Sequence, residues 1–172
     1  MRVWPQAILL AAVSSVGWGL CQDAPGVSQP LTTADAAAVR ESAKAFALAV
    51  AHDITQEGPA AWRRHFADNP SFFMASEGHL VFPDGATATA AIQAFARTIQ
   101  HMELHWGDDL RIDPLTPNFA IMAASWHEIR VSTDGSRVDE SGFFTGTVER
   151  HDGRWQFRNA HWSLAVPPAP AR

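Results

Sequence analysis

Polar side chains in the C-terminal half of the chain have the chemistry needed for proton transfer. His161 can act as a general acid or base near neutral pH, because a free imidazole has a pKa of about 6.5. His127 and Glu140 form a second candidate, since a carboxyl group withdrawn from water can have a raised pKa and serve as a base. Each has a structural alternative: a half-buried His161 that hydrogen-bonds a helix, and a simple polar pair of His127 and Glu140 at the mouth of a cavity.

Two predicted β-hairpins decide whether these side chains meet. Asp134-Gly135 and Asp152-Gly153 favour two-residue turns, and such turns would place Phe144 opposite both Ser125 and His161. Because side chains alternate along a strand, one face of the sheet then gathers the candidate acid–base residues at its polar end, where we expect a pocket. The residues that we predict to contact a ligand there are Ser125, Phe144, Asn159, Ser163, Trp106 and Phe73.

The opposite face of the same strands is predicted to carry an aromatic row of Trp126, Phe143 and Trp162. Such a row on the outer face of a sheet is costly to expose, so it predicts an interface, with cover by a terminal segment as the alternative. A β-bulge that shifts one strand by one residue would exchange the two faces.

Other common chemistries are not favoured by the sequence. His101, Glu103 and His105 share one face of a predicted strand and offer three side chains of metal-ligand type. Met102 and Leu104 form the complementary apolar face, which should point to the core and leave the polar set outside, so we expect no metal site. The chain lacks a Gly-x-Ser-x-Gly elbow and a glycine-rich phosphate loop, and we expect no cofactor.

The elements that position these residues follow from periodicity and breakers. Thr32-Thr33 with Asp35 predicts the start of a long helix that ends before Gly58, and Pro59 predicts the start of a second helix. A third helix is expected to begin at Thr87 or Thr89, and strands are expected near 71–75, 79–82, 102–113, 119–132, 137–150 and 154–164. This order predicts an α+β fold, with three N-terminal helices packed on a strongly curved antiparallel sheet.

The predicted closing hairpin has the most specific sequence pattern. Residues 144–163 read FTGTVERHDGRWQFRNAHWS. The pattern resembles the closing strands of the NTF2-like superfamily (SnoaL-like, DUF4440-type), which often read F-T-x-V-x-x-R-x-D-G-x-W-x-x-x-x-x-H-x-S. The resemblance extends in pattern over residues 34–164 and implies a cone with an internal cavity that dimerises through its outer sheet face. Members include isomerases, cyclases and dehydratases; the Tyr-containing constellation of ketosteroid isomerase-like members is absent, because this chain has no Tyr.

The N-terminus predicts export. Residues 1–19 resemble a signal peptide, with Arg2 at the start, an apolar run to Val16 that is too short to span a membrane, and small residues before the expected cleavage site. An uncleaved anchor is the alternative. Leu20 before Cys21 disfavours lipoprotein processing. Residues 20–33 are predicted to be a flexible leader and residues 165–172 a disordered tail.

The composition of the chain limits the classes of partner that it can bind. The chain of 172 residues has a net charge of −5 and no dense basic stretch, which does not favour nucleic acid. Its 7 Trp and 10 Phe predict a core, pocket or interface rich in aromatic side chains. We therefore expect a periplasmic or secreted homodimer whose cavity binds a small apolar or amphipathic molecule. The alternative is a cofactor-independent isomerase, lyase or cyclase that uses His161, His127 or Glu140 as general acid or base.

Overall fold

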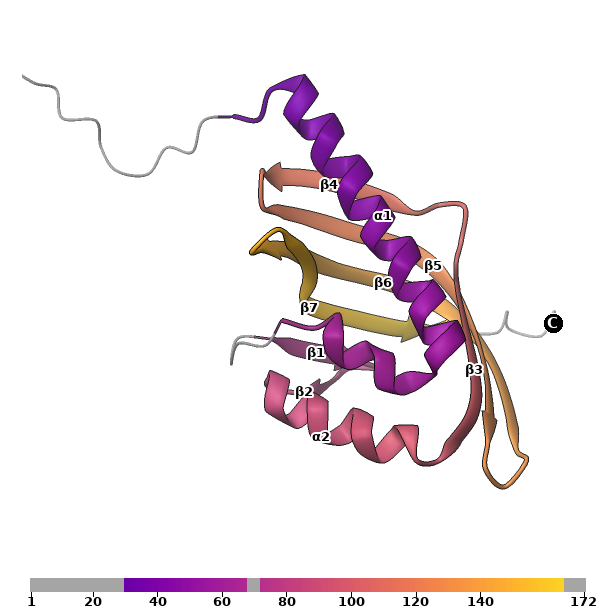
Figure 1. The fold of residues 1–172 in the computed structure, drawn as a ribbon. Coiled ribbons are helices and arrows are strands. Elements are labelled where there is room, and N and C mark those ends of the chain that lie inside the picture. The colour runs from indigo at the N-terminus through magenta and orange to yellow at the C-terminus, as the bar shows by residue number, and fades with distance from the viewer. Residues whose placement is uncertain (1–29, 68–71, 166–172) are drawn as a thin grey trace, which may run out of the picture.

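The computed structural model describes residues 30–67 and 72–165 of the chain (Figure 1). The predicted signal peptide, most of the leader and nearly all of the tail lie outside these residues. The described elements are α1 (Thr33–Glu57), the 3₁₀ helix η1 (Pro59–Arg64), β1 (Phe73–Ser76), β2 (His79–Phe82), α2 (Gly85–Ala96), β3 (Ile99–Trp106), β4 (Arg111–Thr116), β5 (Phe119–Ser132), β6 (Arg137–His151) and β7 (Arg154–Leu164).

The long helix α1 begins and ends where the sequence predicts. Thr32 caps it by accepting the Asp35 backbone N–H at 3.1 Å. It stops at Glu57 because Gly58 turns to a φ of 76°, a conformation that favours glycine. The third helix, α2, begins earlier than predicted, because Asp84 caps it by accepting the Thr87 N–H at 2.7 Å.

One sheet contains all the strands, in the order β2-β1-β7-β6-β5-β3, with β4 also paired to β5. The sheet is open and mostly antiparallel, as predicted, but β1 pairs parallel to β7. The single strand predicted at 102–113 is two strands, which pair with different halves of β5. Between them Gly107 passes so close to β5 that a Cβ atom there would lie 2.0 Å from Ser125 Oγ.

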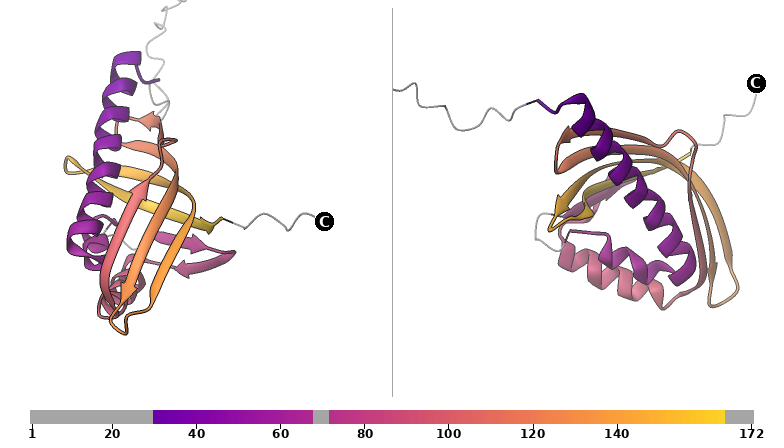
Figure 2. Two further views of the ribbon diagram at one scale, coloured as in Figure 1. Left: turned by 90° about the vertical axis from the view of Figure 1, so that its right-hand side faces the viewer. Right: turned by 45° about the horizontal axis from the view of Figure 1, so that its top comes forward.

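The sheet curves around the helices and leaves its other face uncovered by any described helix (Figures 1 and 2). The helix α1 crosses β3, β4 and β5, and two tryptophans attach it to the sheet. Trp106 Nε1 donates to the Ala47 carbonyl at 2.8 Å, and Trp155 Nε1 donates to Ser42 Oγ at 3.1 Å. The core between the helices and the sheet contains Phe72, Phe144 and Phe157, all fully buried. The α+β cone predicted from the sequence is therefore confirmed.

The register of β5 against β6 differs from the prediction by one residue. The connecting loop has three residues, Thr133 to Gly135, because the Ser132 N–H donates to the Ser136 carbonyl at 2.8 Å and Gly135 has a φ of 84°. Glu128 therefore lies opposite Glu140, where a two-residue turn would have placed Ile129. The predicted faces of β5 were wrong along its whole length, because a shift of one residue moves every side chain to the other face.

The closing hairpin has the predicted turn but also a bulge. Asp152 and Gly153 both have positive φ, and Val148 lies opposite Phe157 as expected. The register then shifts, so that Thr147 pairs with Asn159 and Arg158 is the extra residue.

Side chains and a neighbouring segment satisfy the backbone at this bulge. Asn159 Oδ1 accepts the Thr147 N–H at 3.1 Å, while the Phe157 N–H donates to the His65 carbonyl at 2.7 Å. Beyond the bulge Phe144 faces Trp162, and the predicted pairing of Phe144 with His161 was wrong.

Candidate functional site

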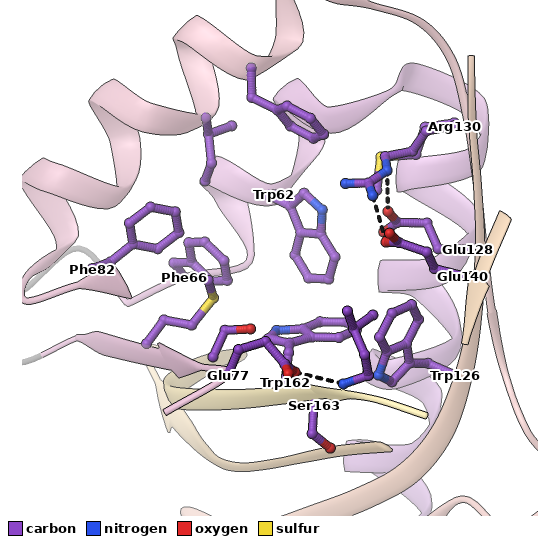
Figure 3. A pocket seen from close by; sticks show the side chains of 16 residues that line it. Trp62, Phe66, Glu77, Phe82, Trp126, Glu128, Arg130, Glu140, Trp162 and Ser163 are labelled. Atoms are coloured by element: carbon purple, nitrogen blue, oxygen red, sulfur yellow. Dashed lines mark hydrogen bonds and ion pairs between the residues drawn. The ribbon is translucent and has the colours of Figure 1, made fainter. Parts of the chain in front are cut away.

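A cavity of about 290 Å³ opens between the concave face of the sheet and the two shorter helices (Figure 3). Side chains from η1, α2, the β1–β2 hairpin, β3, β5, β6 and the end of β7 surround it, so residues far apart in the sequence meet there. The lining residues are Trp62, Phe66, Met74, Ser76, Glu77, Phe82, Ile92, Phe95, Met102, Trp126, Glu128, Arg130, Glu140, Trp162, Ser163 and Leu164.

Three tryptophans dominate the wall of this cavity. Trp162 meets Trp62 edge-on, with ring centroids 5.7 Å apart and planes at 89°, and meets Trp126 at 5.2 Å and 73°. Trp62 also stacks on Phe66 at 5.6 Å. Gly142 makes room for this cluster, because a Cβ atom there would lie 2.9 Å from Trp126 Cζ2 and 1.8 Å from the Ser163 carbonyl oxygen. The wall is therefore aromatic and closely packed.

The polar end of the cavity is an acid–base triad of Glu128, Arg130 and Glu140. Arg130 Nε lies 3.0 Å from Glu128 Oε1, and Arg130 Nη2 lies 2.6 Å from Glu140 Oε2. The guanidinium also stacks over the Phe95 ring, 5.8 Å from its centroid. Figure 3 shows both carboxyl groups under the one guanidinium, beside the aromatic rings. One cation is thus shared by two carboxylates.

Glu128 is the perturbed group of this triad. Only 9% of the residue is exposed. Burial raises the pKa of its carboxyl group to about 7; the charge of Arg130 opposes that rise, and the charge of Glu140 adds to it. Both protonation states of Glu128 are therefore accessible near neutral pH, which is the property of a group that can accept or donate a proton.

The other end of the cavity lies between the β1–β2 turn and the end of β7. Glu77 lines it and has a φ of 48°, which is unusual for a residue other than glycine. Its carboxylate accepts the backbone N–H of Leu164 at 2.7 Å, and this bond holds the turn against β7.

Of the predicted site residues, Glu140 and Ser163 line the cavity. His161, His127 and Ser125 do not, because the three-residue loop and the bulge turn them to the outer face of the sheet. His127 Nε2 lies 2.7 Å from Asp139 Oδ1, and Ser125 Oγ donates to Asp109 at 2.7 Å. The predicted gathering of Ser125, His127 and His161 around a pocket was wrong.

The other predicted ligand contacts lie behind or outside the cavity. Phe144 is fully buried in the core, with its ring centroid 4.8 Å from that of Trp162, and Trp106 stacks on Trp162 with centroids 5.7 Å apart. Phe73 is exposed, and Asn159 bonds to Thr147 across the bulge. Phe144 and Trp106 thus support the cavity wall without lining it.

The predicted aromatic row on the outer face also needs correction. Trp126 and Trp162 point into the cavity, and only Phe143 lies outside. The cause is again the register, which turns Trp126 inward through the loop and Trp162 inward through the bulge.

The polar face of β3 lies outside, as the alternation of Met102 and Leu104 predicts. His101 Nε2 lies 2.8 Å from Glu103 Oε1, and His105 stacks beside His127 at 6.3 Å. Within residues 30–67 and 72–165, no group of three or more His, Cys, Asp or Glu side chains is arranged to hold a metal ion. No helix in this part of the chain is both long and apolar enough to cross a membrane.

A second titratable pair, the buried His65 and the half-buried Asp53, fixes η1 on α1. His65 Nε2 lies 3.0 Å from Asp53 Oδ2, and Arg64 bonds Asp53 and Glu57 together. Burial lowers the pKa of His65, and the Asp53 carboxylate opposes that shift. Because His65 is not among the residues that line the cavity, we assign this pair the role of holding Trp62 in place.

Sequence reasoning missed Glu128 and Arg130 as site residues. It placed Glu128 and Arg130 on the outer face with Trp126. Met122, Ala124 and Trp126, however, form an apolar stripe on that same face of the strand. That apolar stripe could have predicted the position of Glu128 and Arg130, because it favours the strand register that buries Trp126 over the register that buries His127.

Comparisons with known proteins identify the fold. No family model matches the sequence, and no curated protein matches it. Among solved structures, an NTF2-like superfamily protein from Salmonella enterica subsp. enterica serovar Typhimurium str. LT2 is similar at 14% identity, covering 78% of this chain and 96% of that chain, with a TM-score of 0.65. A hexachlorocyclohexane dehydrochlorinase (LinA) type 2 is similar at 12% identity, covering 81% and 95%, with a TM-score of 0.62. An NTF-2 like protein of unknown function from Shewanella oneidensis MR-1 has 17% identity, covering 72% and 97%, with a TM-score of 0.56.

The chain is therefore an α+β protein with a cavity on the concave face of its sheet. Its fold is that of the NTF2-like superfamily, as the closing hairpin indicates.

Proposed function

We propose that the cavity binds a small apolar or amphipathic molecule. The observation that carries this proposal is a cavity of about 290 Å³ with an aromatic wall and one polar end. Ligand pockets in proteins begin at about 300 Å³ and combine mostly apolar walls with a few polar groups that fix orientation. The apolar part of the ligand would lie among Trp62, Trp126 and Trp162, and its polar group would face Glu128 and Arg130.

Blocking the cavity from its wall tests this proposal. Ser76 lines the cavity from β1, so Ser76→Trp should fill it without removing a core side chain. Ser141→Trp on the exposed outer face of β6 is the matched control. Binding of p-cresol can be followed by ligand-detected NMR. The wild type and Ser141→Trp should bind it, and Ser76→Trp should not. Equal binding by all three proteins would place the site elsewhere.

A second candidate is cofactor-independent proton transfer, and the burial of Glu128 favours it. With a pKa raised to about 7, Glu128 is suited to remove a proton from a bound substrate at neutral pH, and Arg130 could stabilise the negative charge that develops. Glu140 lines the cavity beside Glu128, whereas His127 and His161 lie outside the cavity. A dehydrochlorinase is among the structures that share the fold.

Exchange with solvent deuterium tests this candidate. In D₂O the wild type should accelerate exchange of the α-protons of a small aryl ketone such as phenylacetone, and Glu128→Gln should return the rate to that of buffer. A rate unchanged by the substitution would remove Glu128 from the mechanism.

We also propose export and self-association. Export to the periplasm or secretion is supported by the pattern of residues 1–19, and the mass of the mature protein would show whether cleavage occurs near Gly19 and whether Cys21 carries lipid. Homodimerisation through the outer face is supported by its exposed apolar side chains Phe119, Ile121 and Phe143.

A further inference from the structure

The charges that line the cavity are out of balance. Its charged residues are Glu77, Glu128, Glu140 and Arg130, which is three carboxyl groups against one guanidinium. Arg130 divides its contacts between Glu128 and Glu140, which lie directly opposite each other on β5 and β6. Like charges in that position repel each other. Glu77 accepts the Leu164 N–H, and no cation among the described residues is paired with it, so the charged residues that line the cavity carry an excess of negative charge when ionised.

The aromatic wall adds to the attraction for positive charge. Trp62, Trp126 and Trp162 surround the space beside the triad, with Phe66 next to them (Figure 3). Phe95 lines the same cavity. The faces of aromatic rings attract cations, most strongly for Trp, by about 0.5–2 kcal/mol per contact. Arg130 already uses Phe95 in this way, which shows that the wall accepts a cation.

Trp126, which lines the cavity, has a hydrogen-bonding group without a protein partner. The indole N–H of Trp126 is buried, and within the described residues it has no hydrogen-bond partner. A buried donor without a partner costs free energy, so the packing around this tryptophan is not optimal for stability.

We infer that the ligand of this cavity is an organic cation: a small primary or quaternary amine with an apolar group. The ammonium group would lie against Glu128 and Glu140, on the side away from Arg130, and the apolar group would lie among the tryptophans. This inference rests on the proposed binding function and adds the charge of the ligand. A second cation would relieve the sharing of one guanidinium by two carboxylates.

The raised pKa of Glu128 agrees with this charge balance. Burial and the adjacent Glu140 charge raise that pKa, and the Arg130 charge lowers it. The charged groups that face Glu128 across the cavity are Arg130, Glu140 and Glu77, all considered above. A ligand ammonium would favour the ionised carboxylate, so binding should strengthen severalfold between pH 6 and pH 8 and release a proton from the protein.

Three probes of similar shape and different charge test the inference by isothermal titration. At pH 7.5 benzylamine should bind at least tenfold more tightly than benzyl alcohol, and benzoate should bind most weakly. Glu140→Gln should weaken benzylamine at least tenfold while benzyl alcohol binding stays within twofold, which also shows that the cavity is intact. Asp139→Asn, the neighbouring residue on the outer face of β6, removes the same charge and should change neither affinity.

The outcomes separate the two proposals. If benzyl alcohol binds as tightly as benzylamine, or if benzoate binds best, the cation inference is overturned and the binding cavity stands. If the Asp139→Asn control weakens benzylamine as much as Glu140→Gln does, the preference reflects net charge rather than the cavity, and the inference is again overturned. If neither benzyl alcohol nor benzylamine binds, the binding function fails with it.

Discussion

Glu128 is almost fully buried, and that burial raises the pKa of its carboxyl group to about 7. Its position on the concave face follows from the three-residue loop between β5 and β6, which sets it opposite Glu140. Arg130, two residues along the same strand, contacts both carboxyl groups. The chemistry available to the cavity therefore depends on how readily one carboxyl group releases its proton.

The free energy of unfolding should depend on the protonation of Glu128. The pKa of Glu128 rises from 4.5 in the unfolded chain to about 7 in the folded protein, so between these values the folded state keeps a proton that the unfolded state has lost. The free energy of unfolding should therefore fall as pH rises from about 4.5 to 7, by about 3 kcal/mol from this residue. Urea denaturation at pH 5 and pH 8 should show that Glu128→Gln gains stability relative to the wild type over this interval.

The exposed residue Glu41 on α1 gives a matched control for this measurement. Glu41→Gln should keep the pH dependence of the wild type. The explanation would be wrong if Glu128→Gln and the wild type lost the same stability between the two pH values.

At the scale of elements, local signals predicted most of the fold, and two departures from regular pairing decided the site. The Thr32 cap, the end of α1 before Gly58 and the Asp152-Gly153 turn are all set by residues adjacent in sequence, so they could be predicted. The extra loop residue before Ser136 and the bulge at Arg158 depend on contacts made at a distance. Phe157, for example, pairs with residues 65–67 next to the bulge, and no local pattern shows that contact.

These departures explain why Glu140 lies on the cavity face, as predicted, and His161 does not. Glu140 lies on β6, the strand whose assigned face the structure keeps. His161 lies beyond the bulge on β7, and its side chain is exposed on the outer face. Strand faces can therefore be read reliably from a turn only as far as the first irregularity.

The pairing of β6 with β7 gives a prediction at this scale. A methyl group at Gly142 would collide with the Ser163 carbonyl and with the Trp126 ring, so Gly142→Ala should push the two strands apart and tilt Trp126 into the cavity. Overpacking of this kind costs about 1–3 kcal/mol. Urea denaturation should show that loss for Gly142→Ala and little change for Ser141→Ala, the exposed neighbour on the same strand. Equal stability of the two variants would mean that β7 shifts to accept the methyl group without loss of folding stability.

At the scale of the whole molecule, the described helices all lie on one side of the sheet, and the other side remains open (Figure 2). Apolar side chains on that open side include Ile121, 42% exposed, and Phe143, 44% exposed. His161 and Thr145 lie opposite each other between them, so the outer face mixes apolar and polar groups. The corrected register thus replaces an outer row of two tryptophans and Phe143 with a smaller apolar surface around Phe143.

The apolar surface around Phe143 leads to a prediction about the oligomeric state. If two copies of the chain associate through their outer faces, Phe143→Glu should place a charge at the centre of that contact and shift sedimentation velocity from dimer toward monomer. Leu48→Glu is the matched control, because Leu48 is 53% exposed on α1, away from the sheet face, and should leave the dimer unchanged. A Phe143→Glu protein that sediments like the wild type would mean that the outer face is not the interface. In contrast, Trp126 and Trp162 line the cavity, so substitutions there should change ligand binding before they change assembly.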